Sequence, residues 1–206
     1  MAILGGWRLF WVATAGLLAM AAAMLAVAGL DSDGYRLVIR ATARTSLIFF
    51  LAAFLASTMT KLAPGPFSSW LRSNRRYLGL SFAMSHFIHL CAIIAVAKLH
   101  PEVFATLSTT GSIVAGSIGY VAIATLAATS FDRMVRLLGA RKWQQIHSFG
   151  SWFIWISFVF TNGKRIPVSL WYALPVVLLF VAMVAKIYAK RQGTSTVSTA
   201  SAASPG

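Results

Sequence analysis

Two histidines deep in an apolar stretch are the residues of this sequence best suited to chemistry. His86 and His89 follow the basic pair Arg75-Arg76, after which residues 77–97 carry no charge. Their spacing places both imidazoles on one face of a helix. Ionisable groups inside a bilayer are expensive and mark functional sites by default, and neutral imidazole is the usual protein ligand of haem iron. The sequence therefore indicates an electron-transfer protein as a candidate class.

The other metal-ligating residue types narrow the possible chemistry. His147 lies five residues after Lys142, at the start of another apolar interval, whereas His100 precedes Pro101 in a predicted loop and is expected to face solvent. None of the four acidic residues falls in a predicted span, which argues against a carboxylate-based ion pathway or di-metal site. The single Cys91 excludes an internal disulfide. Two interpretations of the buried histidines remain open: axial ligation of haem b, or hydrogen bonds to hydroxyls and carbonyls across a helix bundle.

The distribution of charge predicts the elements that hold these histidines. The chain has 206 residues, of which 58% are hydrophobic and 11% charged, and it contains six long intervals without charge. Five of them have 20 or more residues, close to the ~20 that a helix needs to cross the hydrocarbon core. We therefore predict an all-α, polytopic membrane protein, a bundle of six transmembrane helices over residues 1–192. The predicted spans are 7–29, 44–62, 77–98, 109–130, 143–162 and 168–188, and a disordered tail is predicted over 193–206.

The basic residues predict the orientation of the chain. With a cytoplasmic N-terminus, 12 of the 18 lysines and arginines fall in inner segments, so the positive-inside rule favours both termini in the cytoplasm. The net charge of +14 is then explained by topology and lipid headgroups, and we expect no nucleic-acid partner. Arg8 and Ala26-Val27-Ala28 imitate a cleaved signal peptide, but the apolar run between them exceeds the roughly 7–15 residues of such signals. We expect the first span to be retained.

Two motifs resemble the ferric reductase-like transmembrane domain family. The first, similar to its third-helix signature, is Arg75-Arg76-x-Leu78-Gly79-Leu80-x8-His89. The second, similar to its run into the fifth helix, is Thr129-Ser130, Leu138-Gly139 and Trp143-x3-His147. The likeness covers the six-helix layout and most of residues 45–165, and it extends to the small haem-binding membrane subunits of the bacterial methionine sulfoxide reductase system.

This resemblance implies a haem b domain in the bacterial inner membrane that passes electrons across it. The axial ligand candidates would be His89, His147 and His86. The electron donor would be a quinol, or a flavin carried by a separate reductase that docks on the cytoplasmic side. The acceptor would be a periplasmic partner protein or ferric iron, and the chain would be the membrane electron-transfer subunit of an oxidoreductase system.

One departure from the family supports an alternative hypothesis. The family's fifth helix usually carries a second histidine thirteen residues after the first, and here that position is Phe160. The alternative is a haem-free membrane anchor or assembly subunit with the same fold. Two histidines that bind one iron should lie at a similar depth in the membrane. At the rise per residue of a helix, His147 is expected to lie roughly 7–8 Å nearer the inner face than His86 and about 12 Å nearer than His89. The motif favours His89 as the ligand, whereas depth favours His86.

Overall fold

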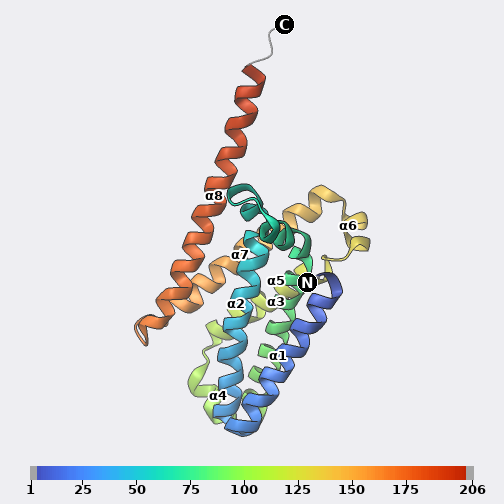
Figure 1. Ribbon diagram of the computed structural model, residues 1–206. Coiled ribbons are helices and arrows are strands. Elements are labelled where there is room, and N and C mark those ends of the chain that lie inside the picture. The colour runs from blue at the N-terminus through green and yellow to red at the C-terminus, as the bar shows by residue number, and fades with distance from the viewer. Residues whose placement is uncertain (1–3, 203–206) are drawn as a thin grey trace.

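The structure is a computed structural model that describes the backbone of residues 4–202 and the side chains of residues 4–192 (Figure 1). Its elements are α1 (Gly6–Ala28), α2 (Ser32–Leu62), α3 (Pro66–Leu99), α4 (Pro101–Leu107), α5 (Thr110–Ala128), α6 (Asp132–Leu138), α7 (Ala140–Gly163), the 3-10 turn η1 (Leu170–Tyr172) and α8 (Ala173–Ala202). No strand occurs in the described part of the chain. The predicted all-α class is confirmed.

Five helical segments are long and apolar enough to cross a membrane: α1, α2, α3, α5 and the segment Leu170–Gln192. Among the described residues, α7 is not in this group, although it has 24 residues and matches the predicted span 143–162. Polar side chains along its length, His147, Ser151 and Asn162 among them, lower its mean hydropathy. The chain is thus a multi-pass membrane protein with five candidate spans, and the sixth span stays a prediction.

The helix α2 begins twelve residues earlier than predicted because Asp31 caps it. The Asp31 carboxylate accepts hydrogen bonds from the backbone N–H groups of Asp33 (3.1 Å) and Gly34 (2.9 Å). These are two of the amides that a helix N-terminus leaves without partners. The predicted outer loop is therefore mostly helix, and the turn between α1 and α2 is short.

The helix α3 also begins early, at Pro66 instead of residue 77. Proline is favourable in the first turn of a helix because its missing N–H has no partner there anyway. The predicted basic loop is therefore a turn over residues 63–65 followed by helix. With 31 and 34 residues, α2 and α3 measure about 46 and 51 Å, which exceeds the ~30 Å of the hydrocarbon core. Their charged ends extend beyond it.

Buried hydroxyl groups join α2 to α3 near the middle of both helices. Thr42, Ser46 and Ser85 are all 0% exposed, and so is Ser81, whose hydroxyl has no hydrogen-bond partner among the described residues. The carbonyl oxygen of Thr42 accepts hydrogen bonds from Ser46 Oγ on its own helix (2.6 Å) and from Ser85 Oγ on α3 (3.0 Å). Small polar residues let two helix backbones approach closely inside a membrane. The pair is the centre of the bundle, and an aromatic cluster around Phe50, Phe54, Phe82 and Phe158 packs beside it.

The connections alternate between the two ends of the bundle, as expected for a chain that crosses repeatedly. In Figure 1 the N-terminus, the turn between α2 and α3, and α6 lie at the upper end, whereas the turn between α1 and α2 and the helix α4 lie at the lower end. The helix α7 runs between these ends. We call the upper end the inner end, following the prediction from the basic residues.

The tail differs from its prediction over the described residues. Disorder was expected over 193–206, but α8 continues to Ala202. Serine, threonine and alanine do not forbid a helix, and no proline occurs in this tail before Pro205. Residues 203–206 lie outside the described part of the chain.

The tight turn between α1 and α2 generates a first prediction. A Cβ atom at Gly34 would lie 2.0 Å from the carbonyl oxygen of Gly29, so Gly34→Ala must displace backbone. We expect a loss of about 1–3 kcal/mol of stability, measured by unfolding in detergent. Gly16→Ala is the control, since no atom lies within 4 Å of its added Cβ. Equal stability of the two variants would contradict the turn geometry.

A second prediction concerns the ion pair that ties α6 to α3. Both terminal nitrogens of Arg76 contact the Asp132 carboxylate, with Nη1 3.1 Å from Oδ2. The Arg76 hydrogen bond holds the pKa of Asp132 below its ordinary value. Folding lowers this pKa. The ion pair therefore makes its full contribution to stability above the unfolded-state pKa of about 3.9, and this contribution is lost as the pH falls through the folded-state pKa of Asp132.

We therefore expect Asp132→Asn to lower the unfolding temperature slightly at pH 7, and this difference to shrink as the pH falls below about 3.9. The effect is small because the Asp132 side chain is 66% exposed, and exposed ion pairs contribute little. Unfolding temperatures measured between pH 7 and 3 provide the check. A constant difference across this range would show that the ion pair is not its cause.

Candidate functional site

His89 lies on the face of α3 that contacts α2, and a main-chain carbonyl fixes its ring. Its Nδ1 lies 2.9 Å from the carbonyl oxygen of Ile39 and 3.0 Å from Thr42 Oγ1. A carbonyl only accepts, so Nδ1 carries the hydrogen and donates it. The lone pair of the ring is then on Nε2. Metal-ligating histidines are oriented in the same way, with the other ring N–H held by a carbonyl or carboxylate.

His86, one turn earlier on α3, lies in an aromatic environment. Its ring centre is 4.7 Å from that of Phe82, 5.8 Å from that of Phe158 on α7 and 6.1 Å from that of Tyr120 on α5. Its Nδ1 is buried without a hydrogen-bond partner among the described residues. The Phe82 carbonyl is within interacting range of the ring but outside hydrogen-bond geometry. An unpaired buried nitrogen of this kind costs about 1–3 kcal/mol.

His147 occupies a separate polar site between α5 and α7. Its Nε2 lies 3.0 Å from Thr129 Oγ1, which itself is 2.7 Å from the carbonyl oxygen of Thr125. The hydroxyl donates to that carbonyl and therefore accepts from His147, so Nε2 carries the hydrogen. The Trp143 ring stacks on the imidazole at 4.4 Å, and its Nε1 donates to the Thr129 carbonyl at 2.8 Å. This arrangement leaves the lone pair of His147 on Nδ1.

The structure brings His86 and His89 together, with ring centres 5.6 Å apart, but it does not bring His147 to either of them. Phe158, which contacts His86, follows His147 by eleven residues on α7. That separation is about 16 Å along the helix, twice the depth difference expected from the sequence. Neither sequence-based pairing with His147 is formed.

His86 and His89 also cannot hold one haem between them. They leave the same face of one helix, so a porphyrin cannot lie between their rings with the two imidazoles on opposite sides. Phe160, at the position where the family carries a second histidine, is 67% exposed and has the Lys164 ammonium 5.6 Å from its ring centre. Among the described residues, His89 is the histidine whose ring is held by a main-chain carbonyl, which leaves its Nε2 lone pair uncommitted.

The remaining candidates add no further ligand set. Among the described residues, no three of the His, Cys, Asp and Glu side chains group together as metal ligands would. His100 is half-buried at the end of α3, contrary to the expected exposure, and its Nε2 has no hydrogen-bond partner. Cys91 is exposed.

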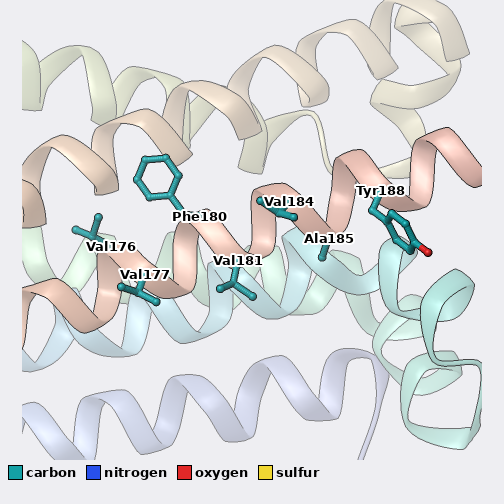
Figure 2. A pocket seen from close by; sticks show the side chains of 7 residues that line it. All are labelled: Val176, Val177, Phe180, Val181, Val184, Ala185 and Tyr188. Carbon is teal, nitrogen blue, oxygen red and sulfur yellow. The ribbon is translucent and has the colours of Figure 1, made fainter.

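A hollow of about 500 Å³ lies along α8 (Figure 2). It is lined by Val176, Val177, Phe180, Val181, Val184, Ala185 and Tyr188. These side chains leave the helix on the side opposite Leu179 and Ala182, which are buried in the bundle. The hollow carries no ligating group, and its apolar character is that of a surface that contacts lipid.

No family model matches the chain, and no solved structure matches it. The likeness to the ferric reductase-like family thus has its support in the two sequence motifs alone. Sequence reasoning missed the partners of His89, because residues 32–43 were assigned to a loop. Thr42, Thr45 and Ser46, three hydroxyl residues within one helical turn, were the available signal.

The contrast between His89 and His86 generates a third prediction. His89→Phe removes the N–H group that donates to the Ile39 carbonyl and leaves this carbonyl without that hydrogen bond. We therefore expect the free energy of unfolding to fall by about 1–3 kcal/mol. His86→Phe removes a nitrogen that has no partner and keeps an aromatic ring among aromatic rings, so we expect little loss or a gain. Unfolding of both variants in one detergent, without haem, provides the comparison. An equal loss in both would mean that His86 does have a polar partner.

Proposed function

We propose that this chain is a membrane haem b protein of the ferric reductase-like type that passes electrons across the bacterial inner membrane. The observation that carries the proposal is the hydrogen bond of 2.9 Å between His89 Nδ1 and the Ile39 carbonyl. This hydrogen bond leaves the Nε2 lone pair of His89 free and holds the imidazole ring against rotation. The ring belongs to α3, a helix that is long and apolar enough to span a membrane. Bound there, haem would supply one-electron redox chemistry.

His89 is the preferred ligand for two independent reasons. It is the histidine that ends the motif Arg75-Arg76-x-Leu78-Gly79-Leu80-x8-His89. It is also the one whose other ring nitrogen is held by a carbonyl, which is the usual state of a metal ligand. His147 presents a hydrogen at Nε2 instead, and His86 has no group that fixes its ring. Both remain candidates for ligation of a further haem.

The chain encodes no electron donor of its own in this proposal. A quinol, or a flavin on a separate cytoplasmic reductase, would deliver electrons at the inner end, where the ends of α2 and α3 carry Lys61, Arg72, Arg75 and Arg76. A periplasmic protein or ferric iron would accept them at the other end. Both termini are proposed to be cytoplasmic, as the positive-inside rule favours.

A haem-free membrane anchor is the second candidate, and two observations favour it. Phe160 replaces the family's second histidine and is exposed. His89 and His147 each have a hydrogen-bond partner within the bundle, so each is accounted for as a structural residue. In this case the histidines stabilise helix packing and carry no electrons.

The deciding experiment, our fourth prediction, is a dithionite-reduced minus oxidised absorbance spectrum of protein purified from haem-supplied cells. We expect a b-type spectrum, with about one haem per chain by pyridine haemochrome, because one histidine is oriented as a ligand. His89→Ala should lose the haem or change its spectrum, whereas His100→Ala, a histidine outside the proposed site, should leave both unchanged.

The two candidate functions give opposite results. Absence of haem from well-supplied cells would overturn the electron-transfer proposal and favour the anchor. Haem that survives His89→Ala with an unchanged spectrum would reject His89 as the ligand. The reduced-minus-oxidised spectra of His147→Ala and His86→Phe would then show which of these histidines is the ligand.

A further inference from the structure

Two basic side chains from different helices meet on one turn of α2 near the inner end. Arg75 Nη1 of α3 lies 3.5 Å from Ser57 Oγ, and Lys186 Nζ of α8 lies 3.2 Å from the carbonyl oxygen of Phe54. The Lys186 ammonium also lies 4.0 Å from the centre of the Phe54 ring. Both side chains are half-buried. Because Phe54 and Ser57 are three residues apart, they are neighbours on one helix face, and the two cations are held next to each other.

This Arg75–Lys186 pair has no acidic partner. The chain has four acidic residues, and two of them pair with other arginines, Asp33 with Arg36 and Asp132 with Arg76. The other two, Asp31 and Glu102, lie at the opposite end of the bundle, beside the turns before α2 and α4.

The positive charges at this site act on one another. Arg75 and Lys186 carry like charges and contact positions three residues apart on α2. Its hydrogen-bond partner and that of Lys186 are a neutral hydroxyl and a neutral carbonyl. Two like charges taken partly out of water without a counter-charge are costly. An anion between them would remove that cost.

The sequence places the pair at the boundary of the apolar layer. Arg75 lies just before the charge-free residues 77–97, and Lys186 directly follows the charge-free residues 166–185. Arg75 is nine residues into α3, about 14 Å from the turn at its start, within the length by which α3 exceeds the hydrocarbon core. The charge-free intervals therefore predict that the two cationic groups lie near the lipid phosphates.

We propose that Arg75 and Lys186 form an oxyanion site that binds the phosphate of an anionic phospholipid headgroup between α2, α3 and α8. The planar guanidinium of Arg75 can give two parallel hydrogen bonds to phosphate oxygens, and the ammonium of Lys186 adds a point charge. Basic pockets between membrane helices on the cytoplasmic side bind such headgroups in general. Inorganic phosphate has the same chemistry and is the alternative source. The site does not include His89, the proposed haem ligand.

Native mass spectrometry of the full chain in mild detergent tests this fifth prediction. With phosphatidylglycerol we expect one retained lipid, and with phosphatidylcholine none. The double variant Arg75→Gln/Lys186→Gln should bind phosphatidylglycerol at least about tenfold more weakly. The control is Arg72→Gln/Lys142→Gln, which removes the same charge from two exposed positions and should bind normally. Arg75→Lys/Lys186→Arg keeps both charges and should retain the lipid.

Two further measurements test whether the double variant is folded and whether the bound anion is a lipid headgroup or free phosphate. Unfolding in phosphatidylcholine shows whether the double variant is folded, and we expect it to be at least as stable as the unsubstituted protein because a like-charge repulsion is removed. Competition with millimolar inorganic phosphate identifies the source: displacement of the lipid indicates a shared oxyanion site, and stabilisation by phosphate without lipid retention indicates a free-phosphate site. Lipid retention by the folded double variant, or equal loss in the control, would overturn the proposal.

Discussion

The close packing of α2 on α3 through buried hydroxyl groups is the interaction on which the rest of the structure depends. Inside a membrane no water satisfies polar groups, so a buried hydroxyl is stabilised by a hydrogen bond within the protein. Thr42, Ser46 and Ser85 all form such bonds, whereas Ser81 Oγ has no partner among the described residues. Ser46 and Ser85 both donate to the Thr42 carbonyl, one within α2 and one from α3. This shared acceptor holds the two backbones close together. The same approach brings His89 within 2.9 Å of the Ile39 carbonyl, and so decides the state of the candidate ligand.

The histidines are distinguished by their partners as well as by their depth. His89 and His147 each donate one ring hydrogen, to Ile39 and to Thr129, and each keeps its lone pair on the opposite nitrogen. His86 has aromatic neighbours and an unpaired Nδ1. An imidazole without a partner in a low-dielectric interior is a cost that folding alone does not explain. The three residues therefore have three different chemical capacities, although the sequence makes all three of them ligand candidates.

Charge is distributed by the same constraint that governs the hydroxyls. Among the described residues, the interior of the bundle holds no carboxylate, and Arg76 is the basic residue of α3 that has an acidic partner. Arg76 stabilises the position of α6, whereas Arg75, its neighbour in sequence, points to α2 and meets Lys186 there. Adjacent arginines in one motif thus serve different purposes, one structural and the other suited to an anion.

The sequence by itself determined the helical class, the membrane environment and the approximate position of most helices, because charge-free length and apolar composition fix these locally. It did not determine where α2 and α3 begin, since the Asp31 cap and Pro66 extend helices through charged segments that resemble loops. Only the tertiary structure decided which histidines meet and which cations share a turn of α2. Such contacts depend on the rotation and register of helices far apart in the chain, and Lys186 meets Phe54 across 132 residues. Hydrophobic periodicity carries little information about that register, because in a membrane helix both the lipid-facing and the buried side are largely apolar.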